Sequence, residues 1–87
     1  MKYTIHIVDQ ALKELSRIPD RDAKRVDEAI LHLESVPRPY GCVKLTSSAD
    51  RWRVRVGDYR ILYIINDEKA HVDVCRILNR KEAYKKR

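Results

Sequence analysis

The sequence predicts an α+β domain in which a helical hairpin packs on one face of a mainly antiparallel four-stranded sheet, in the order β-α-α-β-β-β. Two observations predict it. Apolar residues recur at intervals of three and four between residues 9 and 33, which is helical spacing. From residue 51 to 77, apolar and polar residues mostly alternate, which is strand spacing. At 87 residues the chain has room for one domain, so we treat 1–87 as a single unit.

The N-terminal third predicts one strand and two helices. Tyr3, Ile5 and Ile7 alternate with polar residues, as in a strand. Asp9 is the expected N-cap of the first helix, because its carboxylate can accept a bond from an early helix N–H. The apolar stripe of that helix is Ala11, Leu12, Leu15 and Ile18. Pro19-Asp20 breaks the run and opens a second helix, whose stripe is Ala23, Val26, Ala29, Ile30 and Leu33.

The second half of the chain predicts three strands. The segment 37–41 holds two prolines and ends the second helix, since proline disfavours helical geometry in the residue before it. We expect a loop from 37 to 50, with a short extended piece around 42–45 left open. Strands then follow at about 51–56, 59–66 and 70–77. The middle one is apolar on both faces and should be central. We expect the basic tail to form a helical turn or a frayed end.

The most informative stretch runs from Arg51 to Arg60. Three apolar residues alternate there with three arginines, namely Arg51, Arg53 and Arg55, so the strand has an apolar side and a guanidinium side. Gly57-Asp58 reverses the chain, and Arg60 brings another guanidinium close to the hairpin. The planar fork of arginine matches the oxygens of a phosphate. In a chain with a net charge of +6, this row favours an anionic partner, and RNA is the first candidate.

Other classes of protein and site are not expected. No apolar run is long enough for a signal peptide or a membrane span, so we expect a cytoplasmic protein without a membrane partner. Cys42 and Cys75 do not form a Cys-x-x-Cys pair, which argues against a metal or redox motif; two free thiols or one disulfide stay open. His6, His32 and His71 are scattered along the chain. We therefore expect no metal site and no cofactor.

Four stretches carry a family resemblance: Leu12-Lys13-Glu14-Leu15, Lys44-Leu45, Trp52-Arg53-Val54-Arg55-Val56-Gly57-Asp58-Tyr59-Arg60-Ile61-Leu62-Tyr63 and Asn79-Arg80-Lys81-Glu82-Ala83-Tyr84. The chain resembles the RelE/ParE toxin superfamily of type II toxin-antitoxin systems over nearly its whole length, and its RelE-like branch in particular. The resemblance implies a ribosome-dependent messenger RNA endonuclease that inhibits translation. In that reaction a ribose 2′-oxygen attacks the adjacent phosphate. The implied partners are a cognate antitoxin, mRNA in the ribosomal A site and ribosomal RNA.

Carried over residue by residue, the resemblance implies catalytic roles for Arg60, Arg80 and Tyr84. The RNA-binding candidates are Arg51, Arg53, Arg55, Lys44, Lys81 and Lys85. Preorganised cations aimed at developing charge are usually the largest catalytic contribution, which suits the two catalytic arginines. Tyr84 would orient the 2′-hydroxyl or stack on a base. Many relatives carry a glycine and a histidine just before Arg80, where this chain has Ile77-Leu78-Asn79, so no strong proton donor is visible.

Alternative interpretations stay open at this level. A ParE-type inhibitor would bind DNA gyrase without cutting RNA, and an inactive member would only bind its antitoxin. The arginines of 51–55 are then a solvated strand face, Tyr84 docks the C-terminus, and Arg60 forms a structural bridge with Asp58 or Asp73. Trp52 is expected in the core, because it shares a strand face with Val54 and Val56.

Overall fold

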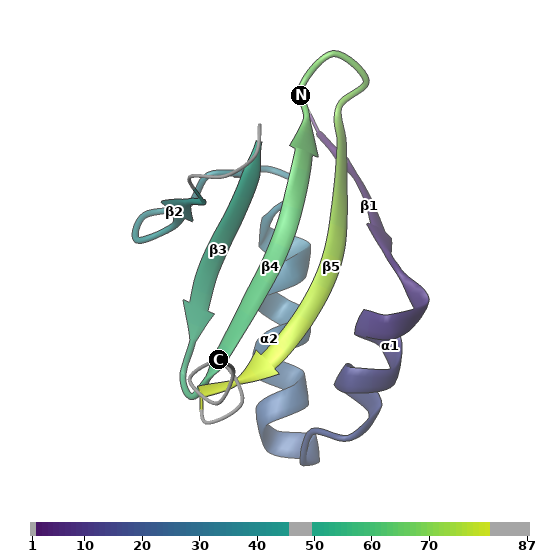
Figure 1. Ribbon diagram of the computed structural model, residues 1–87, viewed down its shortest axis with the longest axis vertical. Coiled ribbons are helices and arrows are strands. Elements are labelled where there is room, and N and C mark those ends of the chain that lie inside the picture. Colours follow the sequence, from purple (N-terminus) through teal and green to yellow (C-terminus); the bar gives the residue numbers. More distant parts are fainter. Residues whose placement is uncertain (1, 46–49, 81–87) are drawn as a thin grey trace.

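The computed structural model describes residues 2–45 and 50–80 (Figure 1). In chain order the elements are β1 (Thr4–Ile7), α1 (Asp9–Ser16), α2 (Asp20–His32), β2 (Val43–Lys44), β3 (Arg51–Val56), β4 (Tyr59–Asn66) and β5 (His71–Asn79). The α+β class and the order of the predicted elements are confirmed. The predicted number of strands is wrong, because the extended piece before the arginine-rich strand forms β2 and makes a fifth strand.

The strands form one mixed sheet in the order β1-β5-β4-β3-β2. β1 runs parallel to β5, and the other neighbouring pairs are antiparallel. β4 is therefore the central strand, as its two apolar faces predicted. β2 pairs with β3 through Val43 opposite Arg53 and Lys44 opposite Trp52, which places a short edge strand beside the arginine-rich strand.

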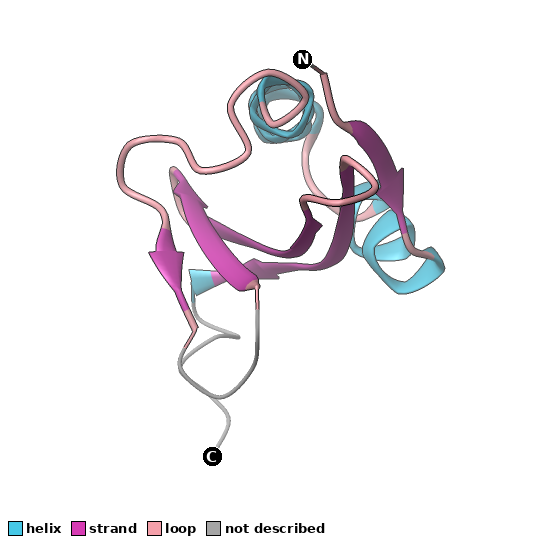
Figure 2. Cartoon of the chain, turned by 90° about the horizontal axis from the view of Figure 1, so that it is seen from above, coloured by secondary structure: helices cyan, strands magenta, loops and turns pink. Residues whose placement is uncertain are grey.

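The core lies between the helices and the sheet. Figure 2 shows α2 across the concave side of the curved sheet and α1 beside β5. The buried apolar residues come from both helices, from their connection and from β3, β4 and β5: Ala11, Ile18, Val26, Ile30, Leu33, Val54, Ile61, Tyr63, Ile65, Val72, Val74 and Ile77. Within residues 2–45 and 50–80, no helix covers the opposite face of β3 and β4. None of the helices in these ranges is both long enough and apolar enough to cross a membrane.

Two details of α1 differ from the prediction. Val8 occupies the N-cap position, where no side chain makes a capping bond, and Asp9 is the first helical residue. A carboxylate in the first turn still interacts favourably with the helix dipole. Leu12 is 48% exposed and does not belong to the apolar stripe. It lies about 100° around the helix from the buried Ala11, and this short helix presents only a narrow face to β5.

A polar cluster around Arg38 ties the long loop before β3 to the sheet. The Arg38 guanidinium donates to both carboxylate oxygens of Asp67, at 3.2 and 2.8 Å, and lies 5.1 Å from the centroid of the Trp52 ring. The Tyr3 hydroxyl donates to the same carboxylate at 2.7 Å. The Arg38 hydrogen bond, followed by that of Tyr3, holds the pKa of Asp67 below its usual value. These contacts fix the end of the sheet at which β3 begins.

Glu14 of α1 completes the edge of β5 beyond the end of β1. The last pair of β1 and β5 is Ile7 with Val74. Further along, the Glu14 carboxylate accepts hydrogen bonds from the backbone N–H of Ile77 at 2.7 Å and from Nε of Arg76 at 2.8 Å. Burial opposes the charge on Glu14, but these bonds hold its pKa below the ordinary value. The helix is therefore docked by a charged group as well as by apolar packing.

We expect Glu14→Gln to lower the free energy of unfolding by about 1–2 kcal/mol at pH 7, because hydrogen bonds to a charged group contribute roughly 1.5–3 kcal/mol and Arg76 is partly exposed. Since folding lowers this pKa, the stabilisation is present above the unfolded value of about 4.3 and is lost as the pH falls through the folded value. Urea unfolding at pH 7 and pH 3 measures the effect, which should shrink at pH 3. Glu28→Gln, on the exposed face of α2, is the control. Equal losses of unfolding free energy in the two variants would show that the charge of Glu14 does not help to dock α1 on β5.

Candidate functional site

The face of the sheet opposite α2 carries the arginines of β3 and β4. The register pairs each arginine of β3 with a residue of β4: Arg51 with Ile64, Arg53 with Leu62, and Arg55 with Arg60. Facing residues of antiparallel strands point to the same side of a sheet. The residues between them, such as Val54 and Ile61, point into the core. We call this surface the arginine face and define it by Arg51, Arg53, Arg55, Arg60, Leu62, Ile64 and Leu78.

Arg60 lies deeper in this face than the arginines of β3. Arg51, Arg53 and Arg55 are exposed, whereas Arg60 is 8% exposed. It occupies the central strand, with Arg55 facing it on β3 and Leu78 facing it on β5. A guanidinium enclosed in this way is held in position before any ligand arrives, which is the property that electrostatic stabilisation requires.

Arg80 lies at the end of the sheet where Arg55 faces Arg60. Its backbone N–H donates to the carbonyl of Asp58, in the turn between β3 and β4, at 2.6 Å. β5 pairs with β4 up to this turn. The chain therefore leaves β5 beside the hairpin that carries Arg55 and Arg60. The Arg80 side chain is exposed.

A further cation, which the sequence did not indicate, lies beside the turn. Gly57 has a φ of +58°, in the left-handed region that favours glycine. The Nε group of Arg55 donates to the Gly57 carbonyl at 3.3 Å. A Cβ added at Gly57 would lie 3.5 Å from the guanidinium of Arg25, on α2. Arg25 belongs to α2 and is exposed. Its position beside the turn depends on how α2 packs, and helical periodicity carries no signal for that contact.

Some predicted site residues do not join this group. Lys44 faces Trp52 across β2 and β3, and its ammonium lies 6.0 Å from the centroid of the indole ring. Trp52 packs against the core, as predicted, so Lys44 lies on the side of the sheet away from the arginine face. One residue of register decides this, because neighbouring residues of a strand point to opposite sides. The remaining candidates, Lys81, Tyr84 and Lys85, lie outside the described residues.

The pairing of Arg55 with Arg60 gives a stability prediction. Like charges directly opposite each other in an antiparallel pair are destabilising, by an amount of about 0.2–1 kcal/mol. We expect Arg55→Thr to raise the free energy of unfolding by about 0.5 kcal/mol at low salt. The gain should shrink in concentrated salt, because exposed charges are screened.

Urea unfolding at two salt concentrations measures this change. Arg51→Thr is the matched control, because it faces Ile64 and makes the same change in residue type and charge. It should give no comparable gain. Equal gains for both variants would show that strand propensity or net charge, and not the facing pair, sets the stability.

The comparisons with known proteins agree on one family. The family model of the ParE toxin of type II toxin-antitoxin systems, parDE, matches residues 5–84. The toxin RelG of Mycobacterium tuberculosis is 31% identical over 87 residues, which cover 99% of this chain and 100% of RelG. RelE1 of Methanocaldococcus jannaschii is 30% identical over 88 residues, covering 98% of each chain. A chain in the crystal structure of the archaeal RelE-RelB complex from Pyrococcus horikoshii OT3 has a TM-score of 0.82 and 29% identity, covering 92% of this chain and 97% of that one.

These matches extend over the helices, the sheet and the arginine-rich hairpin alike. The resemblance noted in the sequence is therefore confirmed at the level of the family. The protein belongs to the ParE toxin family, within the RelE/ParE superfamily, and is a RelE-like toxin of a type II toxin-antitoxin system.

Proposed function

We propose that this toxin is a metal-independent endoribonuclease that cuts messenger RNA in the ribosomal A site and so inhibits translation. The observation that supports it is the arginine face, where exposed guanidinium groups on β3 lie near Arg60 and the backbone of Arg80, at one end of the sheet face that no helix of residues 2–45 and 50–80 covers. Each guanidinium offers paired donors that match a phosphate. An RNA backbone presents phosphates in succession and satisfies such a row as a single small anion does not.

The proposed reaction is an in-line attack of a ribose 2′-oxygen on the adjacent phosphorus. The bond from phosphorus to the 5′-oxygen breaks, which leaves a cyclic phosphate on one fragment and a 5′-hydroxyl on the other. Arg60 and Arg80 stabilise the charge that develops on the phosphate oxygens. Arg53 and Arg55 hold the backbone in line.

Proton transfer is the step that these arginines do not perform. A guanidinium stays protonated at any physiological pH, so it is neither a realistic base nor a realistic acid. We assign the removal of the 2′-hydroxyl proton and the protonation of the leaving oxygen to Tyr84 or to groups of the ribosome. Contacts with ribosomal RNA by Lys81 and Lys85 would bring the tail to the reacting nucleotide. This division of labour explains why cleavage would depend on the ribosome.

A toxin of this kind requires a partner that restrains it. The Pyrococcus horikoshii relative was crystallised as a RelE-RelB complex. We propose that a cognate antitoxin likewise binds this chain, and that both act in the cytoplasm, where messages are translated.

Induction of the chain in bacteria tests the proposal. Sequencing of RNA 5′ ends should show messages cut within translated codons, with 5′-hydroxyl ends, and untranslated RNAs intact. Growth arrest with intact messages and damaged chromosomes would identify a DNA gyrase inhibitor instead. Normal growth with intact messages would identify an inactive, antitoxin-binding member. Either of these two results would contradict the nuclease proposal.

A further inference from the structure

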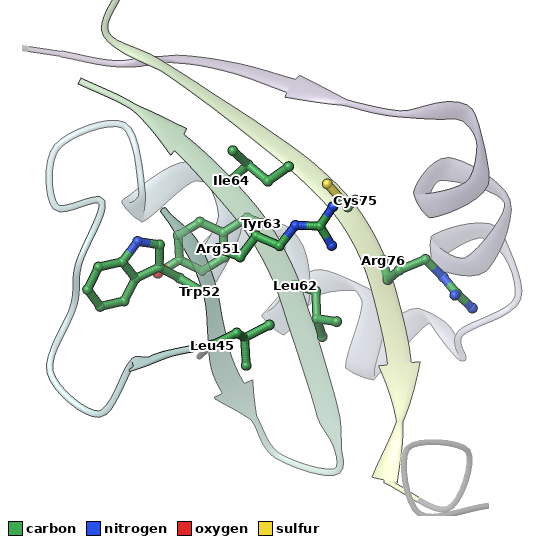
Figure 3. Close-up of a pocket in the computed structure, with 8 residues that line it drawn as sticks. All are labelled: Leu45, Arg51, Trp52, Leu62, Tyr63, Ile64, Cys75 and Arg76. Atoms are coloured by element: carbon green, nitrogen blue, oxygen red, sulfur yellow. The ribbon is translucent and has the colours of Figure 1, made fainter. Parts of the chain in front are cut away.

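The arginine face contains an apolar hollow that the proposed cleavage chemistry does not use. Figure 3 shows the residues that line it, among them Leu45, Arg51, Leu62, Ile64, Cys75 and Arg76. Leu62 and Ile64 form its floor on the central strand and are only partly buried. The backbone N–H of Leu45 donates to the Arg51 carbonyl at 2.8 Å, which holds Leu45 at the β2 side. We call this site the Leu62 hollow.

Cys75 reaches the Leu62 hollow through an irregularity in β5. The register with β4 shifts between Leu62, which faces Arg76, and Tyr63, which faces Val74, so Cys75 is an extra residue. Such a bulge redirects a side chain. The Cys75 thiol lies 3.6 Å from the Asp73 carbonyl, to which it donates, and burial raises its pKa. The thiol is therefore an uncharged and polarisable part of the wall on this side.

Arg51 supplies the remaining side of the Leu62 hollow. Figure 3 shows its side chain extending across the sheet from β3 toward Cys75, on the side where Leu62 and Ile64 lie. Among residues 2–45 and 50–80, those that line the hollow include no carboxylate. The acids of the adjoining elements face other cations: Glu14 pairs with Arg76, and Asp73 lies 3.6 Å from His6. The Leu62 hollow therefore combines an apolar floor, formed by Leu62 and Ile64, with the planar cation of Arg51.

We propose that the Leu62 hollow is a nucleobase subsite, in which one base of the bound RNA rests on Leu62 and Ile64 and stacks against the Arg51 guanidinium. This inference rests on the proposed function and extends it to sequence preference. Bases of single-stranded RNA stack on arginine planes and apolar surfaces, while their phosphates require cations. Leu62 lies two residues from Arg60 on β4, about 7 Å along the strand. One nucleotide spans that interval with its phosphate at Arg60.

A base fits this site better than an apolar side chain of a protein partner does. An aliphatic side chain would cover the floor but offer the Arg51 guanidinium no aromatic face, and a phenyl ring would offer a face but no polar edges. A base has a π-face for the cation and polar edges for the solvent side of the hollow. The surrounding positive charge also favours a chain of phosphates over a neutral apolar segment.

The test uses the full chain and a six-nucleotide RNA with 2′-O-methyl riboses, which lack the attacking hydroxyl. Fluorescence anisotropy at low salt compares this RNA with versions in which one nucleotide at a time lacks its base. We expect one position to show a loss of roughly tenfold and the others to show little. Arg51→Lys keeps the charge but lacks the plane, and Cys75→Phe fills the hollow. In both variants, removing the base at that position should no longer lower the affinity. Binding should still depend on salt. Arg21→Lys, on the exposed face of α2, is the control and should behave as wild type.

The outcomes separate this inference from the proposed function. Salt-dependent binding with equal affinities for every single-abasic RNA would overturn the base subsite and leave the RNA-binding face in place. A base-dependent loss that survives Cys75→Phe would place the base elsewhere and leave the hollow to a protein partner. Absence of salt-dependent binding to any of these RNAs would overturn both proposals.

Discussion

Arg80→Ala should lower the rate of cleavage of a translated message by about 100- to 1000-fold, the loss typical when one preorganised donor to a developing anion is removed. The fold should be unchanged, because the contact that holds Arg80 to the hairpin is made by its backbone N–H to the Asp58 carbonyl, and its side chain is exposed. The cleavage rate of Arg80→Lys should lie between those of the wild type and Arg80→Ala, since lysine keeps the charge but lacks the paired donors.

The measurement is the appearance of cut ends in a translating extract, followed over time at equal toxin concentrations. Arg21→Ala removes the same charge from the exposed face of α2 and should cleave at the wild-type rate. Circular dichroism and urea unfolding establish that each variant is folded. A wild-type rate for Arg80→Ala would remove Arg80 from the reaction.

The second large effect is on salt dependence. If Arg53, Arg55, Arg60 and Arg80 each neutralise one phosphate of a single strand, log K should fall with log salt with a slope of about −2.8. Between 50 and 200 mM salt, the affinity for the non-cleavable RNA would then fall by about 50-fold. The double variant Arg53→Ala/Arg55→Ala should reduce the slope by about 1.4.

Anisotropy titrations at four or five salt concentrations give these slopes. The double variant Arg21→Ala/Lys24→Ala carries the same loss of charge on α2 and should keep the wild-type slope. A flat response in the wild type would mean that the arginine face is not the binding face. Equal reductions in both double variants would mean that net charge alone attracts the RNA.

The sequence predicted what depends on local periodicity. The alternation from Arg51 to Val56 placed three arginines on one side of β3, and the register confirms that they share a face with Leu62 and Ile64. The helical stripe containing Val26, Ile30 and Leu33 was predicted in the same way and is buried. In each case the neighbours along the chain determine which way a side chain points.

Features that depend on pairing between distant segments were missed. A short extended piece around 42–45 was left open, but β2 has two residues, too few to show a period, so neither its pairing with β3 nor the side taken by Lys44 could be predicted. Unbroken alternation along β5 would put Arg76 on the same side as the buried Val72 and Val74. The register shift at Cys75 changes the parity, so Ile77 is buried in the core instead.

The contacts of charged groups could not be predicted either, because they join residues that are far apart in the sequence. Nothing near Glu14 in the sequence indicates that it accepts the N–H of Ile77, 63 residues away. The burial of Arg60 likewise depends on what β3 and β5 place beside it. The charge pattern of a strand therefore predicts a binding face, whereas the depth of each cation within it requires the tertiary structure.

Amide chemical-shift mapping of the labelled toxin with the non-cleavable RNA tests whether RNA binds the arginine face. If RNA lies on the arginine face, the amides of β3, β4 and the end of β5 should shift together as RNA is added, and those on the outer surfaces of α1 and α2 should not. Shifts confined to the helices, with Arg53, Arg55 and Arg60 unmoved, would contradict the account.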